Sequence, residues 1–163
     1  MKRVLIGITL MLTSALAMAQ LPTSDPAVIC GYLAAEQLGT QGWQVDEQQQ
    51  GSCVSDPRGF GREEVGPLHQ LSYQAQGNAT NATVLQVLLD VNPPQAMSSA
   101  NQAFLQAAQR LSTEALGKRL PSTISGAISG SREATATVGN ATLSVTRREH
   151  EDGKGYQMRF SIQ

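Results

Sequence analysis

The chain has 163 residues, a formal net charge of −1, 15% charged and 4% aromatic residues, and two each of cysteine and histidine. The near balance of charges argues against nucleic acid as a partner, because a duplex-binding protein needs a basic surface. The low aromatic content argues against a stacking surface for sugars or single-stranded nucleic acid.

Residues 1–19 predict a secretory signal peptide. Two basic residues precede an apolar run over residues 4–16, small residues follow it, and cleavage is expected after Ala19. The run is shorter than the roughly 20 residues that a transmembrane helix needs. Cleavage leaves residues 20–163 as one domain with a formal net charge of −3. We therefore expect a periplasmic protein without stable membrane insertion.

The two cysteines, Cys30 and Cys53, predict a structural disulfide. An even cysteine number in an exported chain is most simply explained by a disulfide. A redox pair would normally have the spacing C-x-x-C, and a metal site needs more ligands than these two residues. We expect no metal ion and no other cofactor.

Residues 24–45 predict a first helix and a short strand. Ser24 or Asp25 can cap the helix, and Pro26 suits its first position. Two glycines end the apolar pattern of this helix, and residues 43–45 then predict a short strand. Beyond it the chain is expected to return toward the helix.

Alternating apolar residues predict a β-hairpin with strands at residues 71–76 and 83–91. Val84 and Leu88 lie on the face opposite the main apolar side of the second strand. We therefore expect that strand to be central and covered on both faces. A stripe of apolar residues at helical spacing over residues 97–115 then predicts a second helix, with a glycine after its end.

The remaining segment predicts mostly β structure. Residues 120–130 are rich in serine and glycine and predict a single helical turn or an ordered loop. Alternation resumes after them, with turn signals at residues 139–140 and 151–155, and predicts a three-stranded antiparallel meander. The whole pattern predicts an α+β fold with two helices packed on a largely antiparallel sheet.

The tetrapeptide GNAT occurs at residues 77–80 and again at 139–142. An internal duplication would explain this repeat, but so would the turn chemistry of four residues. We prefer the interpretation as turn chemistry.

The connector at residues 54–67 is the candidate binding segment. It places Phe60 between two glycines, with Arg58 and Arg62 on either side. Arginine and aromatic residues carry much of the binding energy at interfaces, and loops often carry function. The alternative is that Phe60 packs back onto the core and that the arginines only solubilise a connector.

Candidates for a catalytic base are limited to His69 and His150. His69 falls in the register of a strand. His150 lies among acidic residues beside a turn, but adjacent strand residues point to opposite faces and do not converge as metal ligands do. The chain has no G-x-S-x-G elbow, phosphate-binding loop or H-E-x-x-H motif.

These observations support three hypotheses. The first is a non-enzymatic binding protein that acts on another cell-envelope protein, as an inhibitor, immunity or assembly factor does. The second is a small periplasmic hydrolase that uses His69 or His150. The third is self-association through exposed sheet edges, with the strand at residues 156–162 as the expected edge.

Overall fold

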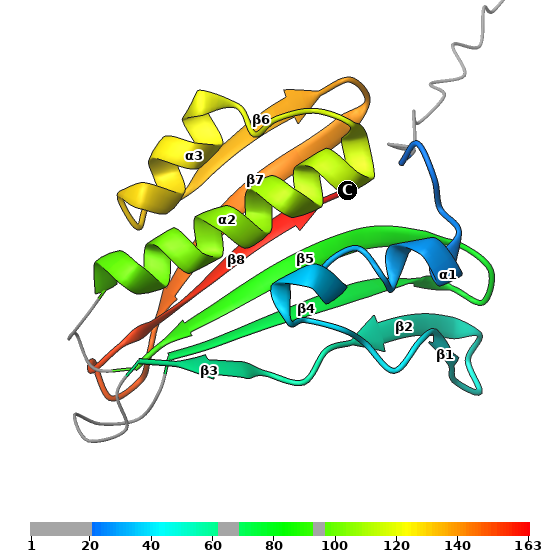
Figure 1. The fold of residues 1–163 in the computed structure, drawn as a ribbon, viewed down its shortest axis with the longest axis horizontal. Helices are drawn as coiled ribbons and strands as arrows, with labels where there is room; N and C mark the ends of the chain where they lie inside the picture. The colour runs from blue at the N-terminus through cyan, green and yellow to red at the C-terminus, as the bar shows by residue number, and fades with distance from the viewer. Residues whose placement is uncertain (1–20, 62–68, 93–96) are drawn as a thin grey trace, which may run out of the picture.

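The fold combines one large sheet with a layer of helices (Figure 1). A computed structural model describes residues 21–61, 69–92 and 97–163. The predicted signal peptide lies outside the described residues, as does Arg62. Within these ranges the chain forms an α+β domain with eight strands and three α-helices, so the predicted class is confirmed and the expected count of two helices is too low.

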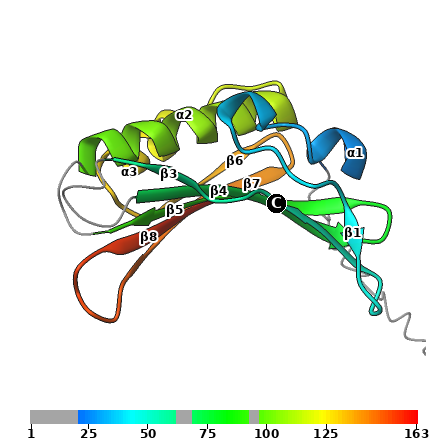
Figure 2. The same ribbon diagram turned by 60° about the horizontal axis from the view of Figure 1, so that its bottom comes forward.

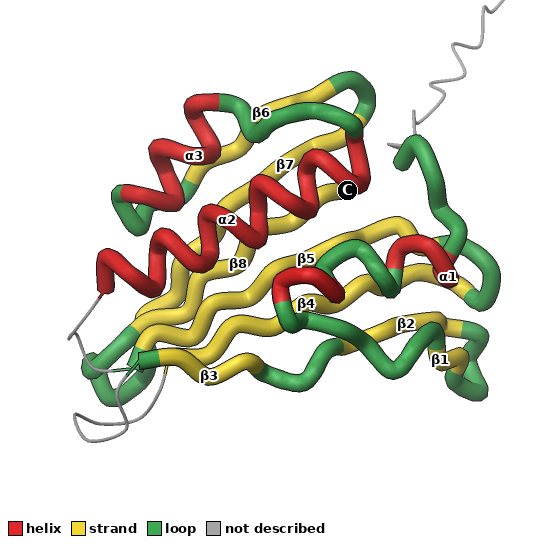
Figure 3. The backbone as a smooth tube through the Cα atoms, viewed as in Figure 1, coloured by secondary structure: helices red, strands yellow, loops and turns green. Residues whose placement is uncertain are grey.

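All neighbouring strands of the sheet are antiparallel (Figure 3). The order across the sheet is β1-β2-β4-β5-β8-β7-β6, and β3 pairs with β4 beside β2. In chain order the strands are β1 (Gln44–Val45), β2 (Gln50–Val54), β3 (Arg58–Phe60), β4 (His69–Asn78), β5 (Ala82–Val91), β6 (Ala134–Val138), β7 (Ala141–Glu149) and β8 (Tyr156–Ile162). The predicted hairpin and the predicted meander are both confirmed.

The strand at residues 156–162 is not an edge, so that expectation is wrong. β8 pairs with β5 on one side and with β7 on the other. Its alternate side chains are all buried on the helix side: Tyr156, Met158, Phe160 and Ile162. Such an apolar strand is favoured at the centre of a sheet, where helices and neighbouring strands cover it.

The helices lie together on one face of the sheet (Figure 2). They are α1 (Pro26–Ile29), the 3-10 helix η1 (Ala34–Glu36), α2 (Met97–Leu116) and α3 (Ser122–Ser129). The predicted stripe of α2 is confirmed, because these residues are buried: Ala100, Phe104, Ala107, Ala108, Leu111 and Ala115.

Helix α3 is longer than the single turn or loop expected for this segment. Serine and glycine have low helix propensity, which is why the sequence pattern did not predict it. Ile124 and Ile128, one turn apart, are fully buried in the core. Burying each of these side chains stabilises the fold by about 1.5–3 kcal/mol. This gain exceeds the free-energy cost of placing serine and glycine in a helix.

The first helix begins as predicted but is short. Asp25 is its N-cap, and the Asp25 carboxylate accepts the N–H of Ala27 at 2.9 Å, with Pro26 following in the first turn. After α1 the chain continues through tight turns to η1. Leu33 and Leu38 from this irregular segment are fully buried, so packing rather than a longer helix holds it on the sheet.

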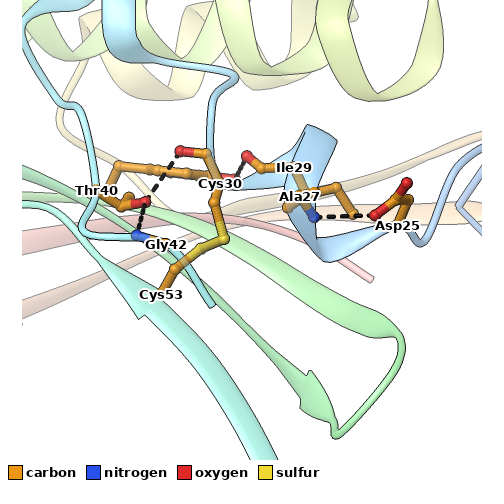
Figure 4. The surroundings of a disulfide bond; sticks show 8 residues. Asp25, Ala27, Ile29, Cys30, Thr40, Gly42 and Cys53 are labelled. Atoms are coloured by element: carbon orange, nitrogen blue, oxygen red, sulfur yellow. Dashed lines mark hydrogen bonds between the residues drawn. A yellow bond between two sulfur atoms is a disulfide. The ribbon is translucent and has the colours of Figure 1, made fainter. Parts of the chain in front are cut away.

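The predicted disulfide is confirmed. Cys30, directly after α1, is bonded to Cys53 on β2, with the two Cα atoms 6.0 Å apart (Figure 4). The Thr40 hydroxyl donates to the carbonyl of Cys30 at 3.1 Å, and the Tyr73 hydroxyl donates to the carbonyl of Ile29 at 2.9 Å. One covalent and two hydrogen-bonded links therefore hold the α1 segment near the sheet.

The two GNAT stretches lie at turns that are not equivalent. The strand order is symmetric about the β5–β8 pair, so that β4 matches β7 and β5 matches β8. One stretch joins β4 to β5, whereas the other joins β6 to β7. At the first turn, the Asn78 side chain accepts the N–H groups of Thr80 and Asn81. This arrangement favours turn chemistry over duplication as the reason for the repeat.

Candidate functional site

The predicted binding segment contains a strand, β3, that the sequence reading did not anticipate. Arg58 donates from Nη1 to the carbonyl of Glu36 at 2.7 Å, which ties β3 to η1. Phe60 is half-buried against the core and lies 5.6 Å from the ring of His69, its partner on β4. Arg58 and Phe60 therefore both contact their own chain, and Arg62 lies outside the described residues.

The two histidines lie on opposite faces of the sheet. His69 is 4% exposed on the helix side of β4. His150 follows β7, and its Nε2 is 3.4 Å from a carboxylate oxygen of Asp90, whose strand position faces away from the helices. The structure does not bring the two histidines into one site. Within the described ranges, no three His, Cys, Asp or Glu side chains gather to hold a metal ion.

A buried polar cluster joins α2, the turn after α3, and β8. The amide of Asn101 donates to the hydroxyl of Ser131 at 2.8 Å, and the hydroxyl of Tyr156 donates to the amide oxygen of Asn101 at 3.0 Å. The Ser131 and Tyr156 hydroxyls are 3.1 Å apart, which closes the triangle. A nucleophilic serine needs a base, and here its partners are an amide and a phenol. The cluster therefore links α2, the turn after α3 and β8 through buried hydrogen bonds.

Two buried tyrosines have perturbed acidity on the helix side. Burial raises the pKa of Tyr73 well above its ordinary value, and the neighbouring Tyr32 adds to the shift. Burial also raises the pKa of Tyr32, with smaller contributions from the Glu114 and Asp25 carboxylates. Both phenols remain protonated at neutral pH, which suits hydrogen-bond donation rather than base catalysis.

The described helices leave the opposite face of the sheet without a covering layer, and we name this face the open face (Figure 2). Alternate residues of six strands form it. The strand register aligns one continuous row across all six, in the order Val54, Gln74, Gln86, Ser161, Ser144 and Thr135. β5 is central, as expected, but the described helices all lie on the opposite face from Val84 and Leu88, so within the described residues the expectation of cover on both faces is wrong.

Uncharged polar side chains dominate the open face. Its charged strand residues are Asp90, Arg148 and Arg159, and all three lie in the two rows nearest His150. The row through Gln86 and the rows beyond it contain Gln, Ser, Thr and Val. These residues are far apart in the sequence and form one surface only because the strand order places them side by side.

The centre of the open face is preorganised. Gln86 is 8% exposed and Ser161 is 4% exposed, although both lie on the face away from the described helices. The Gln74 amide donates to the amide oxygen of Gln86. These side chains are held before any partner arrives, which lowers the entropy lost on binding.

A hollow lies at each end of β5 on this side. The larger, of about 770 Å³, is bordered by Asp46, Gln50, Ser52, Gln76, Thr83 and Val84. The smaller, of about 470 Å³, is bordered by Asp90, Arg148, His150 and Gln157. The open face therefore has an uncharged centre between two indented ends, one bordered by Asp46 and the other by several charged residues.

Comparison with protein-family models, with curated proteins and with solved structures finds no match to this chain.

Proposed function

We propose that this chain is a small exported, non-enzymatic binding protein of the cell envelope, and that it holds another protein on its open face. The observation that carries the proposal is the composition of that face. Depletion of charged residues is one part of the compositional signal of the core of a protein interface. Charged side chains would be expected on a sheet face that only contacts water.

The dimensions of the open face favour a protein over a small molecule. Six strands spaced about 4.8 Å apart span roughly 24 Å, and seven residues of strand span roughly 23 Å. A partner covering this area would bury about 550 Å² per side, which lies in the range of weak or transient protein complexes. Small molecules instead bind in deep, mostly apolar pockets.

The proposed compartment rests on the predicted signal peptide and on the disulfide. Disulfides persist in oxidising compartments such as the periplasm. No helix in the described part of the chain is long and apolar enough to cross a membrane. The predicted signal peptide and the disulfide support the proposal that the mature protein acts in the periplasm after cleavage behind Ala19.

The segment with Arg58, Phe60 and Arg62 is a second candidate contact. The half-buried ring of Phe60 packs against the core, so its truncation is expected to lower stability. If Phe60→Ala abolished partner capture without lowering the melting temperature, this segment rather than the open face would be the binding surface.

The test is native mass spectrometry of the untagged protein released from its own periplasm. Gln74→Arg places a charge in the central row of the open face, whereas Gln106→Arg places the same charge on an exposed position of α2. We expect a stoichiometric protein partner with the wild type and with Gln106→Arg, and its loss with Gln74→Arg at unchanged melting temperature. No partner with the wild type, or equal capture by all three proteins, refutes the proposal.

The hydrolase hypothesis is the weaker alternative. Among the described residues, the contact that supports it is the pair formed by His150 and Asp90, whereas His69 is buried on the other face. The hypothesis requires turnover by the wild type in a broad panel of hydrolase substrates, and loss of that turnover in His150→Ala or His69→Ala with the fold intact. Absence of turnover in the panel would remove it.

A further inference from the structure

Strand β6 forms an edge of the sheet with exposed backbone groups. It pairs with β7 alone, and the two-residue turn at Gly139 and Asn140 joins the two strands. In such a hairpin the residues next to the turn, Val138 and Ala141, form a hydrogen-bonded pair, and the pairs then alternate. The N–H and C=O groups of Thr135 and Thr137 therefore point away from β7.

These four backbone groups have no partner among the described residues. No hydrogen bond from another part of the described chain reaches Thr135 or Thr137. Unpaired strand edges of this kind template pairing with another strand. The N–H and C=O groups of Thr135 and Thr137 are therefore the positions at which a further strand would form hydrogen bonds with β6.

The opposite edge of the sheet is protected, and β6 is not. On that side β1 has two residues and β3 has three, and an isolated bridge between Thr40 and Ser55 covers the gap. Short and interrupted strands are a common protection of sheet edges. β6 has the sequence ATATV, with no charge, no proline and a regular register over five residues.

We propose that a second copy of this chain docks along β6, antiparallel to it, about a two-fold axis at Ala136. In this register Thr135 of each copy faces Thr137 of the other. The two pairs use all four outward groups of each strand and form four hydrogen bonds. The threonine side chains also face each other on the open face, and such cross-strand pairs are stabilising.

The side chains around β6 fit the same register. On the helix side, the half-buried Ala134 faces Val138 of the other copy, so both lose exposed apolar area. Glu133 faces Gly139 of the other copy, so no like charges meet. Helix α3, which packs over β6, has the uncharged sequence STISGAIS and presents only small exposed side chains.

The self-complementary register is the reason for naming a second copy as the occupant. A contact of two five-residue strands is smaller than the roughly 1,000 Å² of a stable interface, so the dimer is weak, with a dissociation constant on the order of micromolar to millimolar. Because the two-fold axis is perpendicular to the sheet, both open faces lie on the same side of the dimer. The dimer would therefore present two adjacent copies of the open face.

The experiment is sedimentation velocity on the mature, oxidised protein at concentrations from about 10 μM to about 1 mM. This range covers the dissociation constants expected for a small interface. Thr137→Pro removes an outward N–H that has no bond to β7, and edge strands tolerate proline at such positions. Thr137→Val retains that N–H and the β-branched shape. We expect the wild type and Thr137→Val to dimerise, and Thr137→Pro to bind its own copy at least tenfold more weakly.

A second measurement needs no variant. Amide hydrogen exchange at Thr135 and Thr137 should slow as the concentration of the wild type rises, while exchange at the opposite edge, in Val45, stays constant. A monomer at every concentration, equal dimerisation of Thr137→Pro, or exchange at β6 that does not depend on concentration overturns the proposal. Binding of β6 to an extended peptide of a different protein, with no self-association, also overturns it.

Discussion

Replacing both cysteines by alanine should lower the free energy of unfolding by about 3–5 kcal/mol. The disulfide joins residues separated by 23 positions, and closing a loop of that size stabilises the fold by about 3.4 kcal/mol in the chain-entropy model. Cys30 and Cys53 are 6% and 2% exposed, so loss of the buried sulfurs adds a further cost of about 1 kcal/mol.

The assay is equilibrium urea unfolding at neutral pH, followed by circular dichroism. Because the cross-link restricts the unfolded chain, its removal should also raise the m-value, which scales with the surface exposed on unfolding. Reduced wild-type protein provides the matched control, since it retains both sulfur atoms. A loss below about 1 kcal/mol with an unchanged m-value would refute the loop-entropy argument.

A different result would follow if the α1 segment detached locally. With the disulfide formed, the Tyr73 hydroxyl also holds the Ile29 carbonyl, and Leu33 is fully buried; neither contact involves a cysteine side chain. We therefore expect one cooperative transition. Two separate transitions would show that these contacts do not hold the segment without the disulfide.

Tyr73→Phe should lower stability by about 1–2 kcal/mol at neutral pH, because a buried carbonyl loses its donor. The pKa of Tyr73 is raised in the folded state, so the free energy of unfolding of the wild type should fall as the pH rises above the ordinary tyrosine pKa of 10.0. The fall should be smaller in Tyr73→Phe. Urea unfolding of the two proteins at neutral pH and at about pH 11 measures the difference. Tyr156→Phe should cost about 1–3 kcal/mol in thermal unfolding, because the buried Asn101 oxygen loses a donor; an unchanged melting temperature would contradict this role. Gly77→Ala should cost about 1–3 kcal/mol in the same assay, because a β-carbon there would overlap the backbone of Asn81 and Ala82.

The sequence predicted the elements whose signals are local. The alternation in β4 and β5 and the helical stripe of α2 each lie within one segment, so the periodicity alone indicates them. The β3 strand was missed because three residues beside glycines are too short to show alternation. The last helix, α3, was missed because packing of Ile124 and Ile128 outweighs a poor local propensity.

The strand order depended on contacts that no local pattern encodes. The pairing of Leu85 with Ile162 joins residues far apart in sequence. Both strands are apolar on one face, and periodicity does not say which apolar strand pairs with which. For this reason the sequence reading placed β8 at an edge and left the neighbours of β5 undefined.

The candidate site was missed for the same reason. On β4, β7 and β8 most of the residues at alternate positions are Gln, Ser or Thr, and within a single strand this pattern indicates only that one face is not part of the core. The open face becomes visible once the register sets Gln74, Gln86 and Ser161 side by side. A scan for long strands whose polar positions lack charge would have been the available signal.

The central place of β8 has a consequence for the timing of folding. β8 is the last strand along the chain, yet it is the strand that joins the half of the sheet ending at β5 to the half ending at β7. Pairings of such long sequence separation form slowly. During synthesis, any chain that still lacks residues 156–162 has two unfinished half-sheets. The completed core therefore cannot form before residues 156–162 have been synthesised.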